Sequence, residues 1–278
     1  MWRGQVSARR LLTEYGLQPK KGLGQNFLTD KNVLGKIVAA AQLGPGDVVL
    51  EVGPGLGHLT RLLAQQAKRI IAIELDDRLV PVLRNELASF DNVELIKGDI
   101  LELPLDSLVL PPDYKVVANL PFYITSAVLR HFLERESPPA RMVVTVQLEV
   151  AQRIVAQPNK MNLLAVSVQF YGQPRIVARI KAGAFYPEPE VDSAVVRIDR
   201  HPAPPMDIQD VAEFFAVVKA GFAQRRKQLR NSLAAGLGRP QTEVVAVLEA
   251  AGVDPRRRPE TLYLQEWAAI TQRLSMEH

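Results

Sequence analysis

Short apolar runs alternate with amphipathic stretches in the first hundred residues, and this alternation constrains the fold more than any other feature of the chain. The runs 48–52, 70–74 and 93–96 have the length and the branched residues of buried strands, whereas 59–67 and 79–87 have helical spacing. Strands that alternate with helices in this way are parallel and are joined by right-handed crossovers. Ligands bind such sheets at the carboxyl ends of the strands, so we expect functional residues directly after each strand.

The pattern continues for another hundred residues and then changes. Further elements are expected as strands at 115–118, 142–147, 175–180 and 193–198, and as helices at 125–134 and 149–156. The proline-rich run 201–205 cannot continue a strand or a helix, and the helical patterns 211–233, 243–250 and 264–274 follow it. We therefore predict an α/β protein: a Rossmann-like domain over residues 1–201, followed by a small all-helical domain over residues 206–278.

The composition excludes several kinds of chemistry. None of the 278 residues is cysteine, which rules out disulfides, thiolate metal sites and the methylation mechanism that adds a cysteine to a base. The four histidines have no ligand spacing, so we expect no metal. The N-terminal residues hold no apolar run long enough for a signal peptide or a membrane span, which predicts a cytoplasmic protein without a membrane partner.

Glycines and acids follow three successive predicted strands. Gly53 and Gly55 come after the first strand and open a helix, where missing side chains let the backbone approach a ligand. Glu74 ends the second strand and can accept hydrogen bonds from two ribose hydroxyls, and Asp99 after the third can accept one from an adenine amino group. The acids suit NAD and S-adenosyl-L-methionine equally. The glycine spacing is shorter than the dinucleotide pattern, so we expect S-adenosyl-L-methionine, and a tight turn without a ligand is the alternative.

The segment after the fourth strand indicates the chemistry. Asn119 and Leu120, stiffened by Pro121, can offer a side-chain carbonyl and a backbone carbonyl to the two hydrogens of an exocyclic amino group. Such contacts turn the nitrogen lone pair toward a methyl donor, and positioning then supplies most of the reduction in the barrier. Phe122 and Phe185 are candidates for the two faces that stack on a base taken out of its helix, although either ring could belong to the core.

These motifs resemble those of the small-subunit ribosomal RNA adenine dimethyltransferases. The similarity extends over nearly the whole chain and is carried by the segments 25–28, 51–57, 98–99, 119–122, 185–196, 222–233 and 254–262, together with Glu74. It implies an S-adenosylmethionine-dependent methyltransferase of Rossmann-like fold. It also implies that Asn26 and Leu28 fold over the cofactor from the N-terminal segment.

The resemblance implies that four further residues complete the cofactor site, namely Gly53, Glu74, Asp99 and Asn119. The chain departs from the family pattern at Phe122, where tyrosine is usual, so the ring is kept for stacking and the hydroxyl is lost. Tyr123 and the segment 160–164 depart from the family pattern as well.

Basic residues are concentrated in the predicted helical domain. We expect Arg225, Arg226, Lys227 and Arg230 to contact RNA phosphates, whereas the arginines at 256–258 are more typical of a solvated turn. The resemblance implies that the partner is the RNA of an immature small ribosomal subunit, in which two adjacent adenines of a hairpin are each methylated twice. We expect the protein to act as a monomer.

Three other functions remain compatible with parts of the pattern. A large-subunit methyltransferase of the antibiotic-resistance type has similar core motifs, but the segments 224–233 and 254–262 favour the small-subunit enzymes. A non-catalytic RNA-binding relative would not need the intact segment from Asn119 to Pro121. A nicotinamide dehydrogenase would need an acid arranged for hydride transfer, which the sequence does not suggest.

Overall fold

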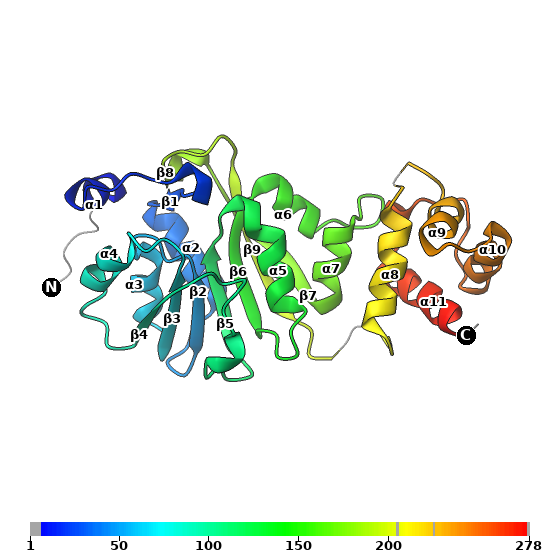
Figure 1. Ribbon diagram of the computed structural model, residues 1–278, viewed down its shortest axis with the longest axis horizontal. Coiled ribbons are helices and arrows are strands. Elements are labelled where there is room, and N and C mark those ends of the chain that lie inside the picture. The colour runs from blue at the N-terminus through cyan, green and yellow to red at the C-terminus, as the bar shows by residue number, and fades with distance from the viewer. Residues whose placement is uncertain (1–6, 204–205, 225, 277–278) are drawn as a thin grey trace. The chain divides into compact units, whose positions relative to one another are not determined.

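The computed structural model describes residues 7–203, 206–224 and 226–276, and it divides into two compact units (Figure 1). The sheet unit comprises the described residues up to Ala151 together with Pro174–Arg200. The helical unit comprises Gln152–Gln173 and the described residues from His201 onward. The segment 152–173 thus belongs to the helical unit, whereas the sequence places it in the first domain.

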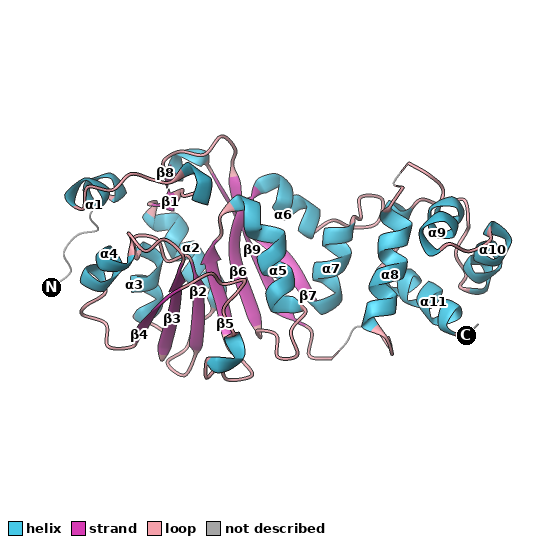
Figure 2. Ribbon diagram, viewed as in Figure 1, coloured by secondary structure: helices cyan, strands magenta, loops and turns pink. Residues whose placement is uncertain are grey.

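The sheet unit is built on a seven-stranded sheet with helices on both faces (Figure 2). Its strand order is β4-β3-β2-β5-β6-β9-β7. The strands are β2 (Val48–Val52), β3 (Arg69–Glu74), β4 (Val93–Lys97), β5 (Lys115–Asn119), β6 (Arg141–Gln147), β7 (Gly172–Ile180) and β9 (Ser193–Arg200). The strands from β4 to β6 are parallel and β9 runs antiparallel to β6. The predicted Rossmann-like fold is confirmed.

Burial on both faces explains why these segments form the centre of a sheet. Val116, Val117 and Ala118 of β5 are fully buried, and so are Ile70, Ile71 and Ala72 of β3. Continuous apolar runs of this kind are typical of parallel strands that helices cover on both sides. The order reverses between β2 and β5, which are neighbours in space but not in sequence. A crevice at the carboxyl ends of the strands is expected at such a reversal.

Eleven α-helices occur in the described part of the chain. They are α1 (Ala8–Glu14), α2 (Lys31–Ala41), α3 (His58–Ala64), α4 (Val80–Glu86), α5 (Thr125–Leu133), α6 (Leu148–Ile154), α7 (Leu163–Tyr171), α8 (Val211–Phe222), α9 (Leu229–Leu237), α10 (Gln241–Ala250) and α11 (Leu264–Ser275). The sequence did not predict α1, α2 or α7. Side chains cap all three: Ser7 accepts from Arg10 N, Asp30 from Asn32 N and Val33 N, and Asn162 from Ala165 N.

A second sheet of only two strands lies near the carboxyl edge of the large one. It pairs β1 (Phe27–Leu28) with β8 (Phe185–Tyr186) in antiparallel register, with Leu28 opposite Phe185. Thr29 N and Thr29 Oγ1 extend this pairing by donating to Ala184 O at 3.0 and 3.1 Å. Segments far apart in the sequence therefore meet here. Two residues are too short a run for periodicity to reveal.

The helical unit has its own core, which explains the position of the segment 152–173. Phe170 of α7 packs on Phe214 of α8 with ring centroids 4.9 Å apart, and Trp267 of α11 is fully buried in the same cluster. The prediction of one helix over 211–233 is wrong, because α8 ends at Phe222 and α9 begins at Leu229. No glycine or proline lies between the two helices to signal this break. At the start of α9, the backbone N–H of Leu229 donates to Arg257 O at 2.7 Å.

Two helical glycines predict opposite responses to the same substitution. A Cβ at Gly221 in α8 would lie 2.3 Å from Trp267 Cη2, whereas a Cβ at Gly35 in α2 would meet nothing within 4 Å. Alanine favours a helix over glycine by about 1 kcal/mol. Gly35→Ala should therefore raise the free energy of unfolding by up to about that amount, and Gly221→Ala should lower it by roughly 1–3 kcal/mol. Urea denaturation followed by circular dichroism measures both, and stabilisation by Gly221→Ala would contradict the packing described.

Candidate functional site

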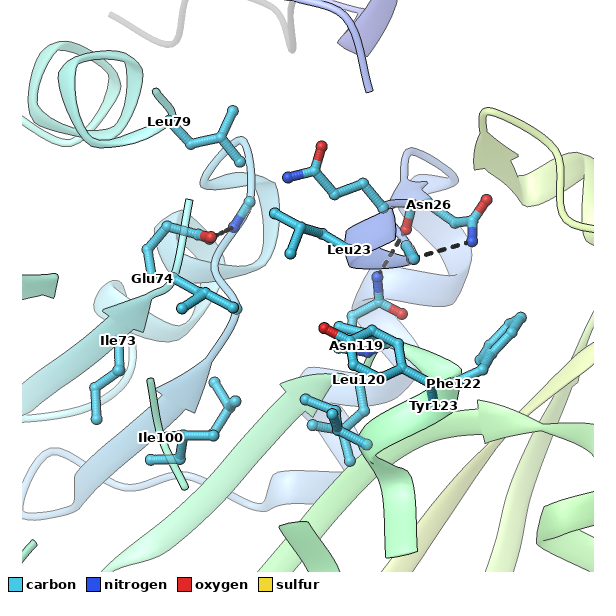
Figure 3. A pocket seen from close by; sticks show the side chains of 18 of the residues that line it. Leu23, Asn26, Ile73, Glu74, Leu79, Ile100, Asn119, Leu120, Phe122 and Tyr123 are labelled. Atoms are coloured by element: carbon cyan, nitrogen blue, oxygen red, sulfur yellow. Dashed lines mark hydrogen bonds between the residues drawn. The ribbon is translucent and has the colours of Figure 1, made fainter. Parts of the chain in front are cut away.

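A cavity opens at the carboxyl edge of the large sheet, at the reversal of strand order. It encloses about 800 Å³ between protein atoms, part of it open to solvent, and it lies within the sheet unit (Figure 3). The ends of β2, β3 and β5 and the residues after β4 line its floor, and residues 23–27 line it from the N-terminal side. Because parallel strands bring their carboxyl ends to one edge, groups that follow different strands meet in this cavity.

Glu74 joins the glycine loop to the end of β3. Its Oε2 accepts a hydrogen bond from Gly55 N at 3.0 Å and its Oε1 accepts one from Asp76 N at 2.9 Å. Gly55 has a φ of +61°, and a Cβ there would lie 3.0 Å from the ring of Phe27. Burial raises the pKa of Glu74, and its backbone hydrogen bonds oppose this. The buried carboxylate of Glu74 thus holds the glycine loop in place beside the cavity.

Asn119 is the last residue of β5, and its side-chain amide contacts the N-terminal segment through its nitrogen. Its Nδ2 donates to Asn26 O at 3.0 Å, and Asn26 Nδ2 donates in turn to Gly24 O at 3.3 Å (Figure 3). Among the described residues, none donates a hydrogen bond to Asn119 Oδ1. The side-chain oxygen therefore remains available as an acceptor at the cavity.

The structure brings most of the sequence-predicted site residues together. The larger cavity is lined by Asn26, Gly53, Gly55, Glu74, Asp99, Asn119, Leu120, Phe122 and Phe185. Leu28 does not line it and instead lines a smaller neighbouring cavity with Gly53, Gly55 and Asn119. Asp99 is half-buried, and its Oδ1 accepts from Leu101 N at 2.9 Å. Phe185 is buried, with 5% of its surface exposed.

Sequence reasoning missed several residues of the cavity. Leu23 and Gln25 line it from the N-terminal segment, which carries no periodic signal. Tyr123 is 60% exposed, and in Figure 3 its ring extends toward Asn119 whereas the ring of Phe122 points away. The tyrosine ring also packs near Gly24, where a Cβ would meet Tyr123 Cδ1 at 3.4 Å. Both aromatic residues border the cavity. The sequence motif indicated Phe122 for stacking, but of the two rings that of Tyr123 is directed toward Asn119.

Glu51 is a second buried carboxyl group beneath the glycine loop. Only 1% of its surface is exposed, and its Oε2 has no hydrogen-bond partner among the residues that the structure describes. It lines the smaller cavity together with Gly53 and Asn119. Burial raises the pKa of Glu51 to about 8, and the nearby charge of Glu74 acts in the same direction. A cation beside this group would favour its ionised form.

The charge of the lining restricts the ligand. Glu74 and Asp99 line the larger cavity, and its described lining residues include no lysine, arginine or histidine. Such a lining suits a ligand that carries positive charge and hydroxyl or amino donors better than it suits a pyrophosphate. In the described parts of the chain, no group of three acids or histidines is placed to hold a metal ion. The same residues contain no helix long and apolar enough to cross a membrane.

The basic residues predicted to bind RNA lie in the helical unit. Arg226 and Lys227 are exposed, Arg230 is half-buried, and Arg225 lies outside the described residues. A backbone hydrogen bond joins Arg230 to the segment 254–258: Arg230 N donates to Pro255 O at 3.1 Å. Two basic stretches that are separate in the sequence are thus adjacent in space.

A family model described as ribosomal RNA adenine dimethylase matches residues 16–273. The chain belongs to this family. Ribosomal RNA small subunit methyltransferase A of Dehalococcoides mccartyi is 50% identical over 266 residues, covering 95% of this chain and 91% of that protein. The protein of the same name from Moorella thermoacetica is 45% identical over 275 residues, covering 95% of each.

Two solved structures share the fold over most of the chain. The 23S rRNA methyltransferase ErmE has a TM-score of 0.73 at 29% identity, covering 90% of this chain and all 100% of that one. A dimethyladenosine transferase from Plasmodium falciparum has a TM-score of 0.78 at 21% identity, covering 90% and 98%. As a member of the ribosomal RNA adenine dimethylase family, the chain is an S-adenosyl-L-methionine-dependent rRNA methyltransferase.

The raised pKa of Glu51 predicts that the difference in stability between the parent protein and Glu51→Gln depends on pH. Because its pKa is about 8 in the folded protein and its ordinary value is 4.5, the folded state binds the proton more tightly. The free energy of unfolding therefore falls as pH rises from about 4.5 to about 8, and Glu51→Gln removes this loss. The melting temperature of the variant relative to the parent should increase by roughly 5 °C or more between pH 5 and pH 9. A difference that stays constant with pH would contradict the raised pKa.

Proposed function

We propose that this enzyme dimethylates the N6 amino groups of two adjacent adenines in a hairpin of small-subunit ribosomal RNA, within an immature ribosomal subunit. The observation that carries the proposal is the cavity itself, in which an acid-lined cofactor site meets the free carbonyl oxygen of Asn119. The relatives named for the small subunit are 50% and 45% identical, against 29% for the 23S enzyme, and this favours the small-subunit substrate. In this proposal the protein acts as a monomer in the cytoplasm.

The cavity residues fit the cofactor by their chemistry. S-adenosyl-L-methionine supplies a methyl group on a sulfonium, which is already a good leaving group. In our proposal Glu74 accepts hydrogen bonds from its ribose hydroxyls, Asp99 accepts one from its adenine amino group, and Gly53 and Gly55 let the loop approach it. Asn26 covers it from the N-terminal segment, and Leu28 approaches it from the smaller neighbouring cavity. Glu74 and Asp99 line this cavity, and its described lining residues include no basic side chain, which suits the positive charge of this ligand.

The end of β5 receives the adenine that is methylated. We propose that Asn119 Oδ1 and the carbonyl oxygen of Leu120 accept the two hydrogens of the amino group, which turns its lone pair toward the methyl donor. Because the leaving group is good, positioning rather than acid-base catalysis supplies the rate. We propose Phe122 and Phe185, both in the cavity lining, as the stacking faces for the flipped base, which requires the Phe122 ring to turn from the direction it has in Figure 3.

The helical unit supplies an electrostatic surface for the RNA in this proposal. Arg226, Lys227 and Arg230 contact phosphates, together with Arg225, which lies outside the described residues. The exposed Arg258 adds charge on the adjacent stretch, whereas Arg257 is held by Glu266 at 2.5 Å and serves the fold. Contacts of this kind recognise the shape of the RNA rather than its base sequence.

Mass spectrometry of the product RNA tests the proposal directly. Small subunits that lack the modification are incubated with the protein and labelled S-adenosyl-L-methionine, and the RNA is digested and analysed. We expect dimethyladenosine at two adjacent positions. Transfer to large-subunit RNA instead would favour the resistance-type substrate, and no transfer to either would favour a non-catalytic RNA-binding role.

Asn119→Ala separates transfer from cofactor binding. The substitution removes the acceptor for the amino group and one neutral hydrogen bond to the N-terminal segment. Transfer should fall at least about a hundredfold because the amino group is no longer oriented. The dissociation constant for the cofactor should rise by less than about tenfold, which is the value of one such bond. Calorimetry and single-turnover transfer measure the two quantities, and unchanged turnover would refute the role of Asn119.

Charge reversal in the helical unit should weaken RNA binding in a salt-dependent way. Arg226→Glu combined with Lys227→Glu removes two exposed cations, so the dissociation constant for the subunit should rise and its salt dependence should flatten by roughly one unit of slope per lost phosphate contact. Lys68→Glu, at an exposed position beside the start of β3, is the control. Filter binding at several salt concentrations measures the slope, and an unaltered slope would place the RNA surface elsewhere.

A further inference from the structure

A strap formed by residues 18–26 crosses one side of the cavity, and the chain anchors it at both ends. Before it, α1 packs through Leu11 and Leu12 into a cluster with Leu56 of the glycine loop and Leu83 of α4. After it, β1 pairs with β8. Three residues of the strap line the cavity, namely Leu23, Gln25 and Asn26. The strap therefore covers the cavity as a segment that is fixed at its ends and can open only in its middle.

Asp76 fastens the middle of the strap to the end of β3. Its carboxylate is fully buried, and it accepts from Gln25 Nε2 at 2.8 Å and from Arg78 Nη2 at 2.6 Å. Lys20 Nζ lies 3.6 Å from Asp76 Oδ1. Gln25 Oε1 accepts from Lys20 N at 2.8 Å, and Arg78 Nη1 donates to Gln18 O at 3.3 Å. Three residues of the strap are thus held, directly or through Arg78, by one buried charge.

The opposite rim holds the strap by weaker contacts. Asn119 Nδ2 donates to Asn26 O, and the ring of Tyr123 and the side chain of Pro121 lie where a Cβ at Gly24 would meet each at 3.4 Å. These are one neutral hydrogen bond and apolar contacts. Hydrogen bonds to a charged group are worth about twice as much. The β3 side is therefore the stronger fastening of the two.

The neighbouring acid shows that the environment of Asp76 is specific. Asp77 follows it directly, but its side chain is 63% exposed and its pair with Lys97 is 3.5 Å long with the lysine 61% exposed. A pair of that kind contributes little. The hydrogen bond from Arg78 holds the pKa of Asp76 well below its usual range, with Gln25 acting in the same direction. The Asp76 carboxylate therefore stays ionised across the neutral pH range.

We propose that Asp76 is a positioning residue that fastens the strap over the bound cofactor and sets the rate at which the cofactor and its demethylated product leave. The proposal rests on the proposed function for the assignment of the cavity to S-adenosyl-L-methionine. Methylating two adenines twice requires four transfers, and each one must be followed by exchange of the spent cofactor. The strength of the contacts between Asp76 and the strap then affects the rate of each of these exchanges.

Asp76→Asn tests this role, with Asp77→Asn as the matched control at the next position. The asparagine keeps the shape and removes the charge, so the dissociation rate of S-adenosylhomocysteine in stopped-flow competition should rise at least about tenfold. Amide exchange of residues 18–26 in the protein without cofactor should rise as well, while exchange in β2, β3 and β5 stays unchanged. Asp77→Asn should change neither quantity.

The reversed pair Gln25→Glu with Asp76→Asn supplies a rescue. It returns a carboxylate and an amide to hydrogen-bond distance, close to Lys20 and Arg78, so the dissociation rate should move back toward that of the parent. Unchanged dissociation and unchanged strap exchange in Asp76→Asn would overturn the proposal. Faster exchange throughout the sheet would also overturn it, because Asp76 would then be a structural residue. Failure of the parent protein to bind S-adenosylhomocysteine would instead contradict the proposed function.

Discussion

The buried carboxylate of Glu74 is the interaction on which the rest of the site depends. One of its oxygens holds the glycine loop through Gly55 N, and the other holds the turn after β3 through Asp76 N. The loop, the strand end and the turn that carries Asp76 are therefore joined through one side chain. Burial of a carboxyl group is costly unless it is hydrogen-bonded, and these two backbone donors offset that cost. The acid is part of the scaffold as well as a cofactor contact in the function that we propose.

The strands of the parallel sheet and the residues that follow them could be predicted from the sequence. Buried parallel strands are continuous apolar runs, and β2 begins and ends at the predicted residues. Gly53, Glu74, Asp99 and Asn119 then met in one cavity because parallel strands share a carboxyl edge. This part of the prediction needed only local patterns and one topological rule.

The parts that the sequence did not predict depend on contacts between distant segments. Gln25 and Asp76 are 51 positions apart and hydrogen-bond to each other, and no periodicity links them. The pairing of β1 with β8 involves two residues on each side, which is below the length at which alternation is detectable. The break between α8 and α9 also involves a distant contact, since Leu229 N, at the start of α9, donates to Arg257 O. Tertiary contacts override local propensity at each of these places.

Asn119 connects the covering of the cofactor to the chemistry that we propose. A side-chain amide is nearly symmetric in shape, so its hydrogen-bond partners decide which end carries the oxygen toward the cavity. Here Asn26 O, at the end of the strap, accepts from Nδ2 and thereby turns Oδ1 toward the site of the amino group. When the strap lifts, that partner is lost and the orientation of the amide is no longer fixed. A strap fastened by Asp76 thus favours the acceptor geometry needed for transfer only while the cofactor is covered, and its release after transfer frees both the spent cofactor and the amide.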